Sequence, residues 1–88
     1  MEKRIGNILI KVYPKADISI LNKIISNYSE IIIGRMGIPL KDNNFSLISL
    51  IIEADTDIIG AFTGKLGKCK NIKVKSNLFK LEGVANDL

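Results

Sequence analysis

Hydrophobic and polar residues alternate near the start of the chain, and the spacing of the apolar residues changes after Pro14. Between Arg4 and Tyr13 the side chains alternate along the segment, with isoleucine and valine on one side, which predicts a β-strand. From Asp17 to about Tyr28 the apolar residues recur every three or four positions, which predicts an amphipathic helix with Asp17 as its N-cap. The chain is therefore expected to begin with a strand and a helix.

Two further extended segments follow, separated by a short polar turn. The first runs from Glu30 to Ile38, is rich in isoleucine and is closed by Pro39, and the second runs from Phe45 to Ala54. The turn between them, KDNN at positions 41–44, consists of residues that hydrogen-bond their own backbone and tolerate left-handed conformations. A turn this short predicts an antiparallel hairpin.

The last third of the chain predicts a second helix and a fourth strand. Acidic residues at positions 55–57 suit a helix N-terminus, and the helix is expected to run through about Leu66, with Gly67 as its C-terminal stop. Residues 71–79 alternate again, with lysines on one side. The order β-α-β-β-α-β predicts an α+β, ferredoxin-like fold: a four-stranded antiparallel sheet with two helices on one face. Residues 1–80 form one domain, and residues 81–88 are expected to be a flexible tail.

The segment from Phe45 to Ala54 is apolar on both sides of the strand. Leu47 and Ile51 lie on one side, and Leu50 and Ile52 lie on the other. A single layer of helices covers only one face of a sheet, so we expect a second subunit to cover part of the other face. This predicts a homo-oligomer, either a dimer or a tetramer; the alternative is that the C-terminal tail folds back over the face.

Composition limits the possible partners and the compartment. The 88 residues include 13 Lys and Arg and 9 Asp and Glu, giving a formal net charge of +4. The lysines are spread along the chain, which favours a solvated surface and makes nucleic acid an unexpected partner. One cysteine, Cys69, cannot form an internal disulfide, which fits a reducing cytoplasm. No apolar stretch approaches the roughly 18 residues that span a membrane, so no membrane association is expected.

The sequence offers no catalytic residues, metal ligands or cofactor motif. There is no histidine, which removes the commonest general base and transition-metal ligand. A single cysteine cannot supply the paired thiolates of a soft-metal site. Tyr13 and Phe45 are the only aromatic residues on the first and third strands, too few for the stacking surface of an RNA-recognition motif. We therefore expect neither an enzyme nor a cofactor.

Three glycines in the second predicted helix invite comparison with a phosphate-binding loop. The segment GAFTGKLGK lacks the spacing of that loop, and Leu66 stands where a hydroxyl should follow the lysine. Gly60, Gly64 and Gly67 instead fall at i, i+4 and i+7 and form one smooth stripe. Glycine inside a helix costs about 1 kcal/mol relative to alanine, so the stripe predicts close approach of the other helix, the sheet or a neighbouring subunit, with a bound ligand as the alternative.

The segment GRMGIP is the candidate ligand or interface site. Gly34 and Gly37 flank two residues whose side chains should point to opposite faces, in a strand that kinks or bulges before Pro39. Met36 is most simply a core or interface residue. Arg35 needs an acidic partner, either a carboxylate within the oligomer or a bound small anion.

The segments IIIGRMGIP, SLISLIIEADTDIIGAFTGKLGK and NIKVKSNLFK resemble the family of small regulators attached to the iron-only hydrogenase system, over about Ile5 to Lys80. The resemblance implies a stand-alone ACT-like domain, similar to the C-terminal half of the nickel-responsive repressor. Such domains typically pair through their sheets and bind a small effector near the subunit interface. The repressor's nickel site uses histidines, which this chain lacks, and Pro14 to Asp17 replace the glycine-containing turn of amino-acid-binding ACT domains.

The resemblance thus implies a regulatory, small-molecule-sensing homo-oligomer linked to the iron-only hydrogenase system. The alternative is a protein–protein adaptor without a small-molecule site, with a hydrogenase-system protein as its partner.

Overall fold

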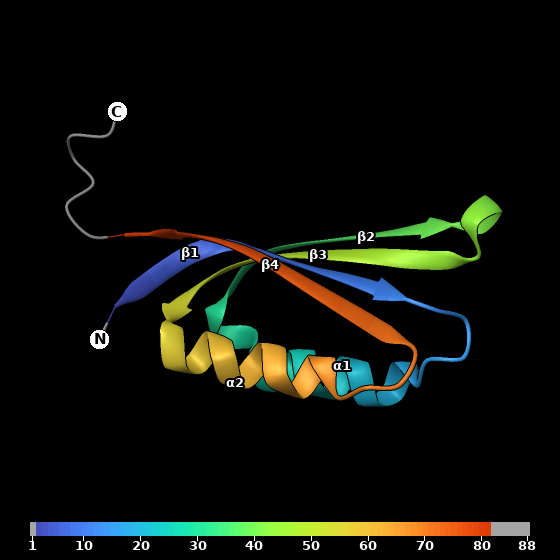
Figure 1. The fold of residues 1–88 in the computed structure, drawn as a ribbon, viewed down its shortest axis with the longest axis horizontal. Helices are drawn as coiled ribbons and strands as arrows, with labels where there is room; N and C mark the ends of the chain where they lie inside the picture. Colours follow the sequence, from blue (N-terminus) through green and yellow to red (C-terminus); the bar gives the residue numbers. More distant parts are fainter. Residues whose placement is uncertain (1, 82–88) are drawn as a thin grey trace.

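Four antiparallel strands form one sheet, and both helices lie on the same side of it (Figure 1). The computed structural model describes residues 2–81, and the strand order in the sheet is β2-β3-β1-β4. The elements are β1 (Lys3–Val12), α1 (Ile18–Asn27), the 3₁₀ turn η1 (Ser29–Ile31), β2 (Ile32–Leu40), the 3₁₀ turn η2 (Lys41–Asn43), β3 (Phe45–Asp55), α2 (Thr56–Gly67) and β4 (Ile72–Lys80). The predicted α+β, ferredoxin-like arrangement is confirmed.

Two residues that were predicted to suit the local backbone, one at a helix start and one in the hairpin turn, do so. The side chain of Asp17 accepts a hydrogen bond from the backbone N–H of Ile20 at 3.1 Å, which caps the start of α1. In the hairpin turn, Asn44 adopts a left-handed conformation with φ of 59°. Asp17 therefore stabilises the local backbone through its side chain, and Asn44 is a residue type that tolerates the left-handed conformation.

Three predicted boundaries are wrong. The extended segment predicted from Glu30 begins at Ile32, because Ser29–Ile31 form the 3₁₀ turn η1. Strand β2 passes through Pro39 and ends at Leu40, because β2 is an edge strand that tolerates a residue without an N–H. Gly67 is the last residue of helix α2 and does not form a left-handed stop after it. The C-cap residue is Lys68, which has a right-handed conformation. Asp55 occupies the N-cap position of α2 but makes no side-chain cap hydrogen bond.

The hydrophobic core lies between the helices and the sheet. β1 and β3, the two central strands, contribute fully buried isoleucine and leucine side chains on their helix-facing sides. Phe62 from α2 is fully buried and stacks on Tyr28 at the end of α1, with ring centroids 4.6 Å apart. The largest side chains of this core are Phe62, Ile8, Ile10, Leu21, Leu50, Ile52 and Leu66.

Gly6 marks a close approach between β1 and β4. It pairs with Ile52 on one side and Leu78 on the other. A Cβ at this position would lie 2.8 Å from the Cα of Leu78 and still closer to the carbonyl oxygen of Asn77. Only glycine lets the two backbones run this close together.

The face of the sheet opposite the helices is open and largely apolar. Figure 1 shows both α-helices on the other side of the sheet. The strand register places on this face, which we call the open sheet face, five exposed apolar side chains: Leu9, Met36, Ile38, Ile51 and Phe79. Met36 is 61% exposed and Phe79 is 71% exposed. A tail folded over this face would involve residues outside the described range, and coverage by a second subunit stays a prediction.

Candidate functional site

The residues of the GRMG segment lie on two different faces of the edge strand β2. Arg35 pairs with Leu50, which is buried under the helices, so the Arg35 side chain lies on the helix side of the sheet. Met36 pairs with Ser49 and lies on the open sheet face. The predicted opposition of these two side chains is confirmed.

A bulge in β2 sets this arrangement. The register with β3 shifts between Ile32 and Gly34, which leaves Ile33 as the extra residue. The predicted irregularity is therefore present, but it precedes Gly34 and does not lie next to Pro39. Ile32 packs against the core on the helix side, whereas Ile33 is 59% exposed.

A groove runs along the helix side of β2, between this strand and α1. It consists of two open hollows of about 550 Å³ and 350 Å³, and Asn22 and Arg35 line both of them. Ile25 and Ile32 contribute apolar surface to the larger hollow. We call this feature the β2 groove.

The smaller hollow of the groove lies toward the end of the β2–β3 hairpin, which is longer than the helix beside it. Helix α1 has 10 residues and is about 15 Å long, whereas β3 has 11 residues and is about 37 Å long. The end of the β2–β3 hairpin therefore extends beyond the helix layer, as Figure 1 shows. Side chains near that end are left without helical cover.

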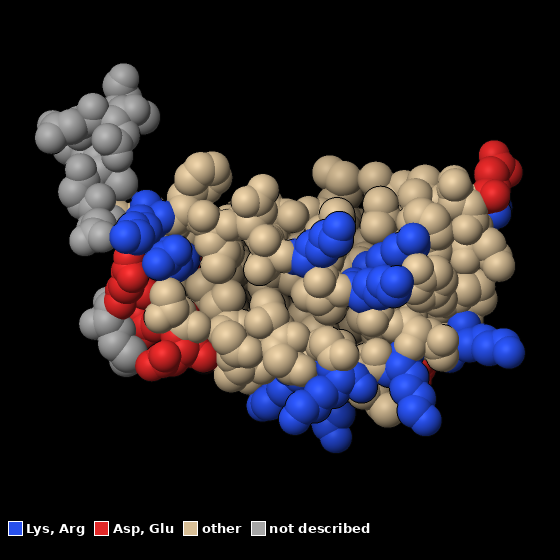
Figure 2. All heavy atoms as spheres, viewed as in Figure 1, with Lys and Arg blue, Asp and Glu red and all other residues tan. Residues whose placement is uncertain are grey.

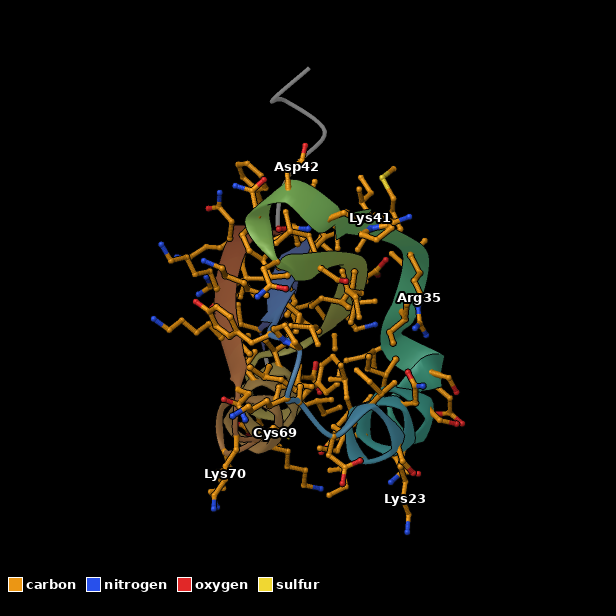
Figure 3. All side chains as sticks on the ribbon, turned by 90° about the vertical axis from the view of Figure 1, so that its right-hand side faces the viewer. Lys23, Arg35, Lys41, Asp42, Cys69 and Lys70 are labelled. Atoms are coloured by element: carbon orange, nitrogen blue, oxygen red, sulfur yellow. The ribbon has the colours of Figure 1, made fainter. Side chains whose placement is uncertain are left out.

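Arg35 is the charged residue of the β2 groove. The only two ion pairs among residues 2–81 join Glu2 to Arg4 and to Lys80, so Arg35 has no carboxylate partner in that range. In Figure 3 its side chain lies at the outer edge of β2. A guanidinium beside an apolar surface can form paired hydrogen bonds with a carboxylate or a phosphate.

Gly37 and Pro39 line the smaller hollow of the groove. Gly37 pairs with Ile48, and a Cβ added at Gly37 would meet no atom within 4 Å. A Cβ at Gly34 would lie 3.8 Å from Ile51, which is an ordinary contact. Packing within the described part of the chain therefore requires neither glycine, and the absence of a side chain at Gly37 widens the groove.

The glycine stripe of α2 faces away from the core. A Cβ at Gly60, Gly64 or Gly67 would meet no atom of residues 2–81 within 4 Å. Neither the other helix nor the sheet makes the close approach that the stripe predicts, so that part of the expectation is wrong. Approach of a neighbouring subunit stays a prediction.

Sequence reasoning missed the polar residues that α1 and η1 contribute to the groove. Asn22, Ser26 and Ser29 line the larger hollow together with Arg35. Their positions at i, i+4 and i+7 form a polar stripe, a signal that the sequence contains. The stripe can be assigned to the edge of the candidate groove only once β2 is known to lie beside α1.

An aromatic pair with a lysine was also missed, at one end of the open sheet face. The Nζ atom of Lys11 lies 5.0 Å from the ring centroid of Tyr13 and 4.3 Å from that of Phe45. A hydrogen bond with the Lys11 ammonium lowers the pKa of the Tyr13 phenol. This cluster adds one positive charge beside the apolar surface.

Within residues 2–81 no group of three or more His, Cys, Asp or Glu side chains is placed to hold a metal ion. Figure 3 shows Arg35 on β2 and Cys69 on the opposite side of the view, near the end of α2. The β2 groove combines the Arg35 guanidinium with the amide of Asn22 and the hydroxyl groups of Ser26 and Ser29. Such an arrangement suits binding of a small anion.

Comparison with protein families supplies a functional context. Residues 4–76 match the TM1266-like family, described as "Iron-only hydrogenase system regulator, putative". The chain belongs to this family. A solved structure of the uncharacterized protein TM1266 from Thermotoga maritima is similar, with a TM-score of 0.83 and 35% sequence identity, covering 90% of this chain and 100% of that one. No protein with a curated description matches the chain.

The family match covers the predicted candidate residues and both helices. It includes Gly34 to Pro39 and the glycine stripe of α2. The resemblance deduced from the sequence is therefore confirmed at the level of the family. None of the helices formed by residues 2–81 is long and apolar enough to cross a membrane.

Proposed function

We propose that this TM1266-like chain is a non-catalytic regulatory domain of the iron-only hydrogenase system that binds a small anion in the β2 groove. In this proposal the domain acts in the cytoplasm as a homo-oligomer, and the open sheet face holds the copies together. The family supports a regulatory role. The groove and the open sheet face supply the two surfaces that a sensor needs, one for an effector and one for a partner.

The observation that carries the proposal is the position of Arg35. Its guanidinium lies in a groove with apolar surface and three polar side chains, and it has no carboxylate partner among residues 2–81. An arginine without a partner retains its full capacity for a bidentate hydrogen bond to an anion. The groove volume falls within the range of about 300–1,000 Å³ that is typical of small-molecule sites.

The anion site is tested by native mass spectrometry of the protein after incubation with a metabolite extract. We expect the wild type to retain a small anionic molecule and Arg35→Ala to lose it. Arg35→Lys keeps the charge but cannot form the paired hydrogen bonds, so it should retain less ligand than the wild type. Retention of the same molecule by Arg35→Ala would place the site elsewhere, and no retention by the wild type would remove the sensing role.

Self-association is tested separately by light scattering across a range of protein concentrations. Ile38 is 46% exposed on the open sheet face, and Ile58 is 40% exposed on α2. Ile38→Lys should weaken association about ten-fold or more, because it replaces an apolar contact with a charge that must lose water. Ile58→Lys is the matched control and should leave association unchanged. A monomeric wild type, or equal effects of both variants, would contradict this use of the open sheet face.

A protein–protein adaptor is the second candidate function, and the exposed apolar surface favours it. Met36 and Phe79 are both more than half exposed on the open sheet face. Such a surface can bind another protein instead of a second copy. An adaptor must capture a hydrogenase-system protein in a pull-down without added ligand, whereas a sensor depends on its effector.

A further inference from the structure

A second hollow lies at the end of the helix layer, well apart from the β2 groove. It has a volume of about 580 Å³ and is formed where the start of α1 meets the end of α2. In Figure 3, Cys69 and Lys70 mark this end of the helix layer, whereas Arg35 lies at the opposite edge. Four lysines line the hollow: Lys15, Lys65, Lys68 and Lys70.

We infer that this hollow, the lysine hollow, binds a small molecule that carries several phosphate groups beside an apolar group, as nucleotides do. Lysine ammonium groups bind phosphate as point charges. The Nζ atom of Lys65 lies 5.2 Å from the ring centroid of Tyr28, which leaves Lys15, Lys68 and Lys70 to contact a chain of phosphates. Ile20 and Ile24 supply apolar surface on which the uncharged part of the ligand can pack. The hollow has the size of a typical small-molecule site.

The local charge favours a ligand with more than one negative charge. Among residues 2–81, Asp17 is the only acidic residue that lines the hollow, so the four lysines and one aspartate of this range give a local net charge of +3. Asp17 already accepts a hydrogen bond from the Ile20 N–H as the cap of α1. None of the four lysines forms an ion pair with a carboxylate of residues 2–81. Figure 2 shows basic side chains along the helix side and also over the middle of the view, and acidic ones mainly at its left end.

The C-terminal end of α2 explains only half of this charge. Lys65 and Lys68 lie at the end of α2, where positive charge complements the helix dipole. Lys70 lies beyond the helix, and Lys15 belongs to the loop before α1. The dipole of α2 therefore gives no reason for these two lysines to lie at the same hollow.

A specific backbone contact brings the two loops together. The N–H of Tyr13 donates a hydrogen bond to the carbonyl oxygen of Asn71 at 3.0 Å. Asn71 adopts a left-handed conformation with φ of 63°, which turns the chain between α2 and β4. Lys15 and Lys70, which are 55 positions apart in the sequence, consequently line one hollow. The arrangement is a product of the fold and is independent of Arg35.

The test measures ATP binding by titration calorimetry at low ionic strength. Lys15→Gln/Lys70→Gln removes two charges from the lysine hollow, and Lys3→Gln/Lys23→Gln removes two exposed charges elsewhere. We expect the first double variant to bind ATP about ten-fold more weakly than the wild type and the second to change less than about two-fold. Inorganic triphosphate should bind more weakly than ATP, because it has no group for the apolar surface.

Cys69 provides a local readout, since it is the only cysteine of the chain and it lines the hollow. ATP should slow its alkylation by iodoacetamide in the wild type, and backbone amide signals of residues 68–71 should shift in ¹⁵N spectra. The inference is overturned if millimolar ATP neither binds nor shifts these signals, if both double variants lose affinity equally, or if triphosphate equals ATP. Tighter binding of a short oligouridylate than of ATP would instead assign the lysines to nucleic acid.

Discussion

Replacing Gly6 with alanine tests the closest backbone contact in the sheet. β1 lies between β3 and β4, and Gly6 pairs with residues of both neighbours. A Cβ there would lie 2.8 Å from the Cα of Leu78 and closer to the carbonyl oxygen of Asn77. Contacts below 3.0 Å are essentially absent for real Cβ atoms, and the opposing atoms belong to a backbone that cannot rotate away. Strand β4 must therefore move.

The expected cost follows from two effects. Forcing a methyl group into a packed region costs about 1–3 kcal/mol, and weakening one ladder hydrogen bond costs about 1 kcal/mol more. We expect Gly6→Ala to lower the free energy of unfolding by about 2–4 kcal/mol. A domain of 88 residues has a total of about 4–13 kcal/mol, so the loss is a large share of it. At 2 kcal/mol the midpoint temperature should fall by about 8–16 °C.

Urea unfolding followed by far-ultraviolet circular dichroism measures this loss. Gly37→Ala is the matched control, since Gly37 is also a strand glycine but a Cβ there meets no atom within 4 Å. We expect the control to lie within about 0.5 kcal/mol of the wild type. The close approach of β1 and β4 is refuted if the free energy of unfolding of Gly6→Ala lies within about 0.5 kcal/mol of the wild type and its dependence on urea concentration is unchanged.

Two further predictions concern α2 and the N-terminal end of the sheet. If the α2 surface stays free, Gly60→Ala and Gly64→Ala should each raise the free energy of unfolding, measured in urea, by up to about 1 kcal/mol. A loss of stability that appears only at protein concentrations that promote association would show that a neighbouring subunit contacts the glycine stripe. Hydrogen bonding from Arg4 lowers the pKa of Glu2 below its usual 4.5, so Glu2 stabilises the folded state above that pH and loses this effect as the pH falls through the folded pKa. Thermal melts of wild type and Glu2→Gln should therefore differ slightly at neutral pH and converge in acid; a constant difference at every pH would contradict the assignment.

Local signals made most of the fold predictable from the sequence. Alternation identified β1 and β4, apolar β-branched content identified β2 and β3, the Asp17 cap fixed the start of α1, and Asn44 matched the left-handed position of the hairpin turn. These features depend on residues within a few positions of one another. The antiparallel order then followed from short connections and right-handed crossovers.

The wrong boundaries depended on longer-range information. Pro39 interrupts a strand only where its missing N–H is needed, and whether β2 lies at an edge is a property of the sheet order. Gly67 could have ended α2 in a left-handed conformation, but the left-handed residue after this helix is Asn71. Residue propensity alone does not decide which of several nearby glycine or asparagine residues adopts the left-handed conformation after a helix.

The candidate site was only partly predictable, because it too depends on contacts between separate elements. The opposite orientations of Arg35 and Met36 follow from strand geometry, and the register agrees with them. Asn22 and the two serines of the groove come from a different element, and their proximity to Arg35 results from packing of α1 beside β2. No spacing within either segment encodes that proximity.

The adjacency of Arg35 and Met36 has a thermodynamic consequence. One residue faces the groove and the next faces the open sheet face, with a single peptide bond between them. An anion that binds more tightly to the associated form than to the free chain must strengthen association by the same factor, and the reverse holds equally. A coupling free energy of about 1.4 kcal/mol would change each affinity ten-fold. In the proposed sensor, communication between an anion in the β2 groove and a copy bound to the open sheet face would require no path longer than one strand.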